Sequence, residues 1–282
     1  WVCTAYLAQD AQMLDVIDKK LDPHIRTAQL ISGASVDLII EEHKLVGHLS
    51  DPNDITRARV PLEQLYEEID EYWLPRSMSI RQCGKKANHG LNYGMAYGTF
   101  ALWSEMDEKD AAAVCIAYHK AYPGLGRYYS RIEDELKQNR TLINCFGDKR
   151  RFLDVWDNKL LNAAYAFKPQ STVGRVTNNG MTSIYQDDSR LLQNVKVAAQ
   201  VHDSVLLHVQ YDTWHELSEI VHICMEYMST PCTYHGIEFI LEKEIKMGTH
   251  WGESTTGHMV TVERTGYLAE DLEKAHIASQ AG

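Results

Sequence analysis

The sequence lacks several features that would assign it to a particular class of protein. Its six cysteines form no Cys-x-x-Cys pair, which argues against a zinc site or a disulfide framework and favours reduced thiols. No run of about 18 apolar residues occurs, so we find no membrane span. The N-terminus has neither an initiator Met nor the basic start of a signal peptide. We therefore expect the interior of a longer cytoplasmic protein.

Positive charge is also scarce. Lys and Arg number 28 against 39 Asp and Glu, and the formal net charge of -11 counts against binding nucleic acid through global attraction. Any contact with DNA must therefore be local. One candidate patch is the run Lys149, Arg150 and Arg151, with Lys137 and Arg140 upstream. A short basic run is more often a solvated helix end or turn than a DNA-binding site.

What is present is sufficient for a folded core. The chain has 282 residues, of which 44% are hydrophobic, and no internal repeat or flexible linker divides it. Apolar spacing predicts helices first and strands later, which indicates an α+β chain. The expected helices cover 4–20, a stretch from Pro23, 61–73, 77–92, 105–122 and 126–139, with an irregular insertion at 33–60. A hairpin after residue 195, a helix at 211–228, a strand at 236–248 and a short helix at 267–277 follow.

The first group of candidate functional residues is a stripe of cations and rings. Arg81, Lys85, His89 and Tyr93 recur at a spacing of four. Because four residues overshoot a helical turn by only about 40°, these side chains share one slowly drifting face. Arg and Lys can hold a triphosphate at one end, and the two rings can stack on a flat or sugar-like group at the other. The alternative is an ordinary solvated helix face.

Two glycines interrupt the same stretch. Gly84 and Gly90 each cost roughly 1 kcal/mol in a helix interior relative to Ala. We therefore expect something to pack closely against the backbone there, either a nucleotide or a neighbouring helix.

The second group lies between two β-rich runs, VKVAAQ and VLLHVQ. This pattern predicts a hairpin with His202, Asp203 and Ser204 at its tip. A carboxylate on a rigid turn can hold Mg²⁺, whereas the alternative is that Asp203 closes the turn by bonding to its own backbone. A lone His beside an Asp, such as His202, is more often a structural residue than a catalytic base. A His/Asp metal-dependent hydrolase stays a further alternative, although no second His-rich motif has ligand spacing.

Taken together, the two groups resemble motifs of family A DNA polymerases. The stretch 81–94 resembles motif B at Arg81, Lys85, Asn88, Gly90, Tyr93 and Gly94, and 201–204 is similar to motif C, usually Val-His-Asp-Glu. Weaker similarities occur at 22–28, 122–123, 145–151, 169–172 and 248–251. The resemblance covers about residues 1–253.

The resemblance implies the helical fingers subdomain and part of the antiparallel palm sheet of a right-hand polymerase. The implied divisions are a palm segment at 1–23, fingers at 24–165, palm at 166–253 and a C-terminal tail at 254–282. Within the fingers, 33–76 is an insertion and 77–94 is the nucleotide-binding helix. The palm carries the motif C hairpin.

The resemblance also implies a reaction and the residues that serve it. The reaction is template-directed DNA synthesis, in which a dNTP is added to a primer-template by a mechanism using two Mg²⁺ ions. The implied nucleotide-binding residues are His24, Arg81, Lys85, His89 and Tyr93. The implied catalytic residues are Lys85, His202 and Asp203, of which Asp203 is the metal ligand. The implied DNA-binding residues are Asn88, Gly90, Arg150, Arg151 and Gln170.

The sequence departs from the family pattern in four places. It has no strand ending Asp-x-Ser-Gln-x-Glu, which supplies the other catalytic Asp, and no thumb. We therefore expect an N-terminal segment or partner chain to supply both, and the isolated chain to be inactive. The alternative is a non-catalytic DNA-binding or accessory module derived from this fold. His89 replaces a Phe or Tyr, Ser204 replaces an acidic residue, and the long segment between His24 and Arg81 suggests a phage lineage.

Overall fold

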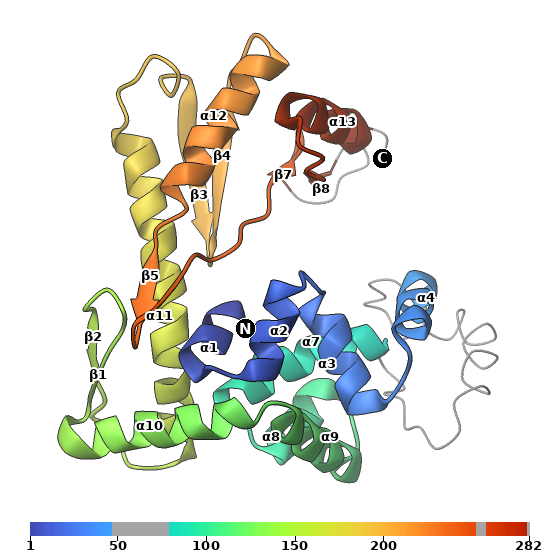
Figure 1. Cartoon of the computed structure of the whole chain (residues 1–282), viewed down its shortest axis with the longest axis vertical. Coiled ribbons are helices and arrows are strands. Elements are labelled where there is room, and N and C mark those ends of the chain that lie inside the picture. The colour runs from blue at the N-terminus through green and yellow to red at the C-terminus, as the bar shows by residue number, and fades with distance from the viewer. Residues whose placement is uncertain (47–78, 252–257, 281–282) are drawn as a thin grey trace. The chain divides into compact units, whose positions relative to one another are not determined.

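The computed structural model describes residues 1–46, 79–251 and 258–280 (Figure 1). The chain divides into two compact units, Trp1–Gln170 and Ser171–Gly282. Helices dominate the first unit, and separate antiparallel hairpins accompany the helices of the second. The predicted α+β class is therefore confirmed. None of the helices within the described ranges has both the length and the apolar character needed to cross a membrane.

In residues 1–46 and 79–170, the first unit has helices followed by a hairpin. They are α1 (Val2–Ala8), α2 (Ala11–Asp18), α3 (Pro23–Ser32), α4 (Val36–Val46), α7 (Ile80–Gly90), the 3-10 helix η1 (Leu91–Tyr93), α8 (Tyr97–Ser104), α9 (Glu108–Ala121) and α10 (Pro123–Asn139). Strands β1 (Thr141–Ile143) and β2 (Lys149–Arg151) pair antiparallel, and α11 (Asn158–Gln186) begins in this unit.

The core of this unit is rich in buried aromatic side chains. Tyr118, Tyr122 and Tyr128 are fully buried, together with aliphatic residues of α10. A buried phenol needs a hydrogen-bond partner, since an unpaired hydroxyl in an apolar interior is costly. The Tyr122 hydroxyl lies 2.7 Å from Thr27 Oγ1, and the Tyr128 hydroxyl donates to the Tyr165 carbonyl at 2.9 Å. These polar contacts connect α3 to the end of α9 and α10 to α11.

The predicted single helix over 4–20 is wrong, because two helices occupy it. Gln9 ends α1 in the left-handed conformation, with φ of 49°, and Asp10 then caps α2. The Asp10 carboxylate accepts hydrogen bonds from the N–H groups of Gln12 and Met13, both at 3.0 Å, and from Gly124 N–H at 2.6 Å. Asp10 thus satisfies two N–H groups in the first turn of α2 and one at the start of α10, which favours the break.

The predicted irregular insertion is wrong at its start, and its part from residue 47 onward lies outside the described residues. Residues 36–46 form α4, preceded by Gly33 at φ of 74°, which ends α3. The helix expected at 61–73 is not among the described residues. The helices expected from Pro23 and over 77–92, 105–122 and 126–139 are confirmed as α3, α7, α9 and α10.

Helix α11 is 29 residues long and contains Pro169, and the sequence analysis did not predict it. Proline lacks the N–H that would bond the carbonyl four residues earlier, which here belongs to Tyr165. The Tyr128 hydroxyl supplies that missing donor. The helix therefore continues through Pro169 with the freed carbonyl satisfied.

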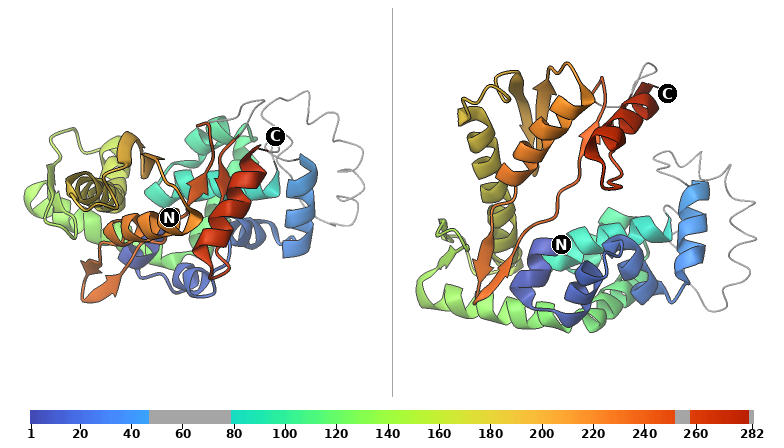
Figure 2. Two further views of the ribbon diagram at one scale, coloured as in Figure 1. Left: turned by 90° about the horizontal axis from the view of Figure 1, so that it is seen from above. Right: turned by 45° about the horizontal axis from the view of Figure 1, so that its top comes forward.

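The second unit combines antiparallel strand pairs with helices in its described residues (Figure 2). Its elements after α11 are β3 (Val195–Val201), β4 (Ser204–Val209), α12 (Trp214–Tyr227), β5 (Cys232–Tyr234), β6 (Ile237–Phe239), β7 (Lys246–Met247), β8 (Val260–Thr261) and α13 (Leu268–Gln280). The antiparallel pairs are β3 with β4, β5 with β6, and β7 with β8. The single strand expected over 236–248 is therefore wrong, since two short strands in different sheets occupy it.

Helix α12 uses two apolar faces. Ile220 and Cys224 pack with Ile184 of α11 and with the β3–β4 hairpin, whereas Leu217 packs with Leu272 of α13. The predicted helices at 211–228 and 267–277 are confirmed. The β3–β4 hairpin is thus supported by both α11 and α12.

Candidate active-site elements

Helix α7 carries the first group of candidate residues. Ser79 caps its start, with Ser79 Oγ accepting from Gln82 N–H at 3.1 Å. The α-helix ends at Gly90, and η1 runs to Gly94, whose φ of 77° stops it. The predicted helix over 77–94 is therefore too long at its end. Tyr93 follows in a 3-10 turn, so the helical stripe ends at His89.

The close packing expected at the two glycines is made by protein groups. A Cβ on Gly84 would lie 2.8 Å from Ala28 N and 2.9 Å from Ala28 Cβ, so α7 meets the α3 backbone there. A Cβ on Gly90 would lie 3.0 Å from Met95 Sδ. Of the two alternatives for Gly84, the neighbouring helix is the one that the structure shows.

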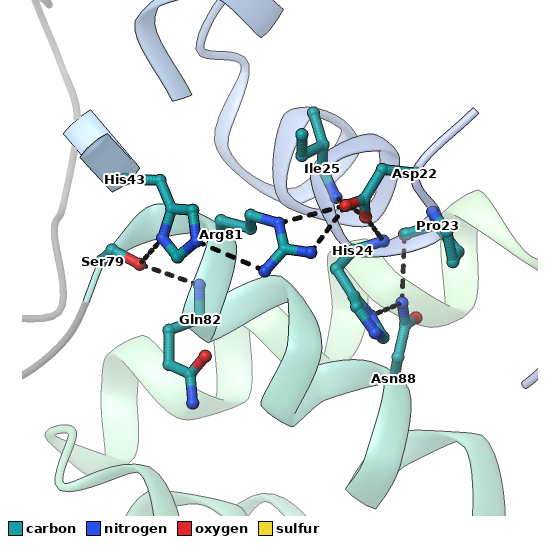
Figure 3. Close-up of polar contacts among 9 residues, drawn as sticks. All are labelled: Asp22, Pro23, His24, Ile25, His43, Ser79, Arg81, Gln82 and Asn88. Atoms are coloured by element: carbon teal, nitrogen blue, oxygen red, sulfur yellow. Dashed lines mark hydrogen bonds and ion pairs between the residues drawn. The ribbon is translucent and has the colours of Figure 1, made fainter. Parts of the chain in front are cut away.

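Asn88 of α7 forms hydrogen bonds that connect this helix to α3. Its Oδ1 accepts from Thr27 Oγ1 at 2.9 Å, and its Nδ2 donates to the Pro23 carbonyl at 3.0 Å. The Asn88 Nδ2 also lies 3.1 Å from His24 Nδ1 (Figure 3). Asn88 is 2% exposed, and Gly90 is buried as well. DNA contacts by these two residues stay a prediction, because here their atoms face the protein.

His24, the second residue of α3, lies where the charges of α7 converge. Burial lowers the pKa of His24, Asp22 opposes that shift, and the positive charges of Arg81, His89 and Lys85 add to it, so that the pKa is about 4. The imidazole is therefore neutral at pH 7. The rings of His24 and His89 are stacked, with centroids 6.0 Å apart and planes at 28°. Three residues of the predicted stripe thus share one environment with His24.

Arg81 forms an ion pair at the start of α3 (Figure 3). Its Nη2 and Nε donate to Asp22 Oδ2 at 2.6 and 3.1 Å, and its Nη1 lies 3.5 Å from His43 Nε2. Asp22 Oδ1 caps α3 by accepting from the N–H groups of His24 and Ile25. Burial would raise the pKa of Asp22, but the hydrogen bonds and charge of Arg81 and the backbone donors hold it below its ordinary value.

The other members of the stripe differ in their surroundings. Lys85 is partly exposed and makes no hydrogen bond or ion pair to the part of the chain that the structure describes. Burial raises the pKa of the Tyr93 hydroxyl, which hydrogen bonds with Thr4, Asn92 and Gln170. Gln170 is otherwise exposed. Two predicted site residues, Tyr93 and Gln170, are therefore joined by a bond that the sequence did not indicate.

The second group lies on the β3–β4 hairpin. Val201 pairs with Ser204, so the turn contains only His202 and Asp203, and Ser204 begins β4. The predicted three-residue tip is therefore one residue too long. His202 has φ of 54°, a left-handed conformation that few residues other than Gly adopt. The Ser204 hydroxyl donates to the Val201 carbonyl at 2.8 Å, which closes the turn.

The hairpin tip is attached to α11 by its backbone and flanking side chains. Thr177 Oγ1, which is buried, donates to the Asp203 carbonyl at 3.4 Å, and Gln200 Nε2 donates to Asn178 Oδ1 at 3.0 Å. The Asp203 side chain is exposed, and its carboxylate accepts no hydrogen bond from the described residues. The alternative in which this carboxylate closes the turn is thus not what the structure shows.

Metal-binding groups are sparse around this carboxylate. In residues 1–46, 79–251 and 258–280, no three His, Cys, Asp or Glu side chains gather closely enough to hold a metal ion. The tip therefore offers one exposed carboxylate, on a turn whose backbone is attached to α11.

The basic patch lies on the β1–β2 hairpin. Arg150 and Arg151 are exposed in β2 and pair with Leu142 and Thr141. The Arg150 guanidinium lies 4.7 Å from the centroid of the Phe152 ring. Both side chains face solvent, and their predicted contact with DNA stays a prediction.

Comparison with known proteins decides the family. The family model for DNA polymerase family A matches residues 60–253, which include α7 and the β3–β4 hairpin. The chain belongs to DNA polymerase family A. It is similar to DNA polymerase I of Treponema pallidum, 20% identical over 261 residues that cover 89% of this chain and 22% of that protein. It is also similar to the DNA polymerase of Mycobacterium phage D29, 31% identical over 106 residues, or 38% of this chain and 17% of that protein.

The fold is similar to that of a solved polymerase domain. The chain is similar to the POL domain of Pol1 from M. smegmatis in complex with DNA primer-template and dNTP, with a TM-score of 0.60 and 17% identity. The likeness covers 81% of this chain and 34% of that one. The family A chain described here spans about a fifth of the length of the curated relatives above.

Several residues that shape the site were not identified from the sequence. Asp22, Glu42 and His43 all contact the start or the first turn of α7. Asp22 precedes Pro23, a pattern typical of a helix N-terminus, so its capping role was readable from the sequence. Its bond to Arg81 was not, because 59 residues separate the two.

Proposed function

We propose that this chain supplies the nucleotide-binding part, and one catalytic carboxylate, of a template-directed DNA polymerase. The observation that carries the proposal is the position of Arg81, Lys85 and His89 on one helix, α7, beside His24, whose ring stacks on that of His89. A neutral imidazole beside two permanent cations suits a polyanion, because it can donate a hydrogen bond without needing to be charged. A nucleoside triphosphate bound along α7 matches this distribution.

The roles of the residues follow from their positions on α3, α7 and η1. Arg81, Lys85 and His24 bind the triphosphate, with Arg81 offering a planar fork and Lys85 a mobile point charge. His89 takes the stacking role against the incoming sugar, and Tyr93 lies beside the insertion site. Gln170, Arg150 and Arg151 contact the primer-template.

The hairpin supplies the second part of the proposed chemistry. Asp203 provides a ligand for Mg²⁺, which prefers oxygen donors and usually binds through one or two carboxylates together with phosphates. When bound, the two ions activate the primer hydroxyl and neutralise charge on the phosphates. Asp203 holds its carboxylate toward solvent on a fixed turn, His202 lies near the primer end, and Lys85 donates a proton to the departing pyrophosphate.

One carboxylate is too few for this site, so a further segment completes the enzyme. We infer that an N-terminal segment, ending Asp-x-Ser-Gln-x-Glu and carrying a thumb, supplies the other Asp. Primer extension with Mg²⁺ and all four dNTPs should be negligible for the 282-residue chain alone and should appear when such a segment is added. Extension by the purified chain alone contradicts this part of the proposal.

Variants of the reconstituted enzyme test the site itself. Asp203→Asn should reduce extension by at least about 10²-fold, since it removes the metal-binding charge. Asp188→Asn is the matched control, because Asp188 is also exposed in the same unit. Lys85→Ala should reduce extension while leaving thermal unfolding unchanged. Equal activities of the Asp203 and Asp188 variants reject the assignment.

A second candidate function is a non-catalytic DNA-binding or accessory module. It is favoured by the lack of any cluster of metal-binding side chains within the described residues. It predicts binding to primer-template DNA that Arg150→Ala and Arg151→Ala weaken, with no extension in any mixture. Extension in the reconstituted mixture rejects it.

A further inference from the structure

Helix α4 contacts both helices of the nucleotide-binding site, although it precedes the residues that match the family model. Glu42 lies on this helix and is 0% exposed. Its two carboxylate oxygens accept from the backbone N–H of Ile80 at 2.7 and 3.0 Å. Ile80 is the first residue of α7. A buried acid 38 residues upstream therefore holds the start of the nucleotide-binding helix.

The contact has a clear physical basis. The first N–H groups of a helix have no partner within it, and its N-terminus carries a partial positive charge. Ser79 satisfies Gln82 N–H, and Glu42 satisfies Ile80 N–H with an opposite charge. A carboxylate is costly to bury unless it is bonded, so its most stable position is against these donors. The pairing therefore restrains the first turn of α7.

His43, the residue after Glu42, contacts the side chains of Ser79 and Arg81 at the start of α7. Its Nε2 lies 3.5 Å from Arg81 Nη1 and its Nδ1 lies 3.5 Å from Ser79 Oγ (Figure 3). A neutral ring with its proton on Nδ1 suits both contacts, since it then donates to the hydroxyl and accepts from the guanidinium. Helix α4 thus touches both the backbone and the first cation of α7.

We propose that Glu42 is a positioning residue for nucleotide binding. It anchors the first turn of α7 and thereby fixes the position from which Arg81, the next residue after Ile80, presents its guanidinium to the triphosphate. This inference rests on the proposed function of α7. It assigns to α4 a task in binding rather than in the chemical step.

The experiment compares two charge-neutralising variants of adjacent residues on α4. Glu42→Gln removes the buried charge, and Glu41→Gln removes the same charge from an exposed side chain. Two quantities are measured on the complete chain: amide hydrogen exchange of residues 79–90, and the affinity for dATP with Mg²⁺ by titration calorimetry. Thermal unfolding followed by circular dichroism checks the fold. If Glu42→Gln is unfolded at the assay temperature, Glu42→Asp takes its place.

We expect Glu42→Gln to speed exchange in the first turn of α7 and to weaken dATP binding by about 3- to 10-fold, the range typical of a charge at a helix terminus. Glu41→Gln should change neither quantity. Faster exchange with unchanged dATP affinity means that Glu42 is only structural, and that result overturns the inference, as does the absence of both effects.

Arg81→Ala separates this inference from the proposed function. A wild-type chain that does not bind dATP, or that binds it equally well without Arg81, rejects the proposed function and the inference with it. Binding that depends on Arg81 but is unchanged in Glu42→Gln rejects only the role of Glu42.

Discussion

Arg81 donates two hydrogen bonds to a single carboxylate oxygen of Asp22, from Nη2 at 2.6 Å and from Nε at 3.1 Å. The other oxygen of Asp22 caps α3. The guanidinium proposed to bind the triphosphate is therefore paired with an acid in this structure. A triphosphate that reaches Arg81 must either displace Asp22 or be bound beside a negative charge.

Asp22→Asn should therefore tighten the binding of dATP and Mg²⁺. Asn is as good a helix cap as Asp, so α3 retains its start while the charge beside Arg81 is removed. We expect affinity to rise by about 3- to 10-fold and stability to fall by roughly 1 kcal/mol, as the charged hydrogen bonds weaken. Titration calorimetry and urea unfolding measure the two effects. Asp15→Asn, which breaks an exposed pair with Lys19, is the control. Weaker binding in Asp22→Asn instead assigns Asp22 the role of orienting Arg81.

Acid should destabilise the protein through His24. Its folded pKa of about 4 lies below the ordinary value of 6.5, so between these values the unfolded chain binds more protons than the folded one. The contribution of His24 to the free energy of unfolding is therefore fully present above pH 6.5 and is lost as the pH falls toward 4. The expected loss is on the order of 2 kcal/mol, a value reduced because solvent screens the partly exposed ring. Asp22, whose folded pKa lies below 3.8, adds a further loss only at more acid pH.

His24→Asn removes this titration and should flatten the pH dependence. Urea unfolding at several pH values between 4 and 7.5 measures it. His208→Asn, at an exposed position of β4, should leave the dependence unchanged. If the free energy of unfolding depends on pH in His24→Asn as it does in the wild type, other groups cause the acid sensitivity.

The contact between α3 and α7 should be intolerant of a single methyl group at Gly84. A Cβ there lies 2.9 Å from Ala28 Cβ and 2.8 Å from Ala28 N, and a backbone cannot move aside as a flexible side chain does. We expect Gly84→Ala to destabilise by roughly 1–3 kcal/mol and to weaken dATP binding, because the helices must separate. Gly126→Ala in α10 meets nothing within 4 Å and should be neutral or stabilising. Comparable unfolding midpoints for the two variants contradict the close contact.

The spacing of apolar residues predicted the helices and strands that depend mainly on residues close together in the sequence. The apolar alternation around Asp203 predicted the β3–β4 hairpin, and apolar spacing predicted α9, α10 and α12. The same patterns did not show the break at Asp10. The apolar positions continue across both helices, and the carboxylate of Asp10 is held partly by Gly124, 114 residues away.

The candidate site was also predictable only where its residues are close together in the sequence. The spacing of Arg81, Lys85 and His89 placed them on one face of a helix, and the structure confirms that they share it. The partners that fix this face come from distant segments, Asp22 at its start and Glu42 on α4, and no local pattern connects them to α7. The sequence therefore identified the side chains that could bind a ligand but not those that hold them.

Helix α11 could not be predicted from local patterns, because a residue from another helix compensates for its proline. Pro169 leaves the Tyr165 carbonyl without its helical donor, and the Tyr128 hydroxyl replaces it at 2.9 Å. Tyr128→Phe removes only that donor and leaves a buried carbonyl unpaired, so we expect a loss of about 1–3 kcal/mol in the free energy of unfolding. Tyr185→Phe removes a hydroxyl from a side chain that is 80% exposed, and it should change stability by less than about 0.5 kcal/mol. Amide exchange around Pro169 should quicken in the first variant alone. Equal stabilities would mean that α11 tolerates Pro169 without the tyrosine.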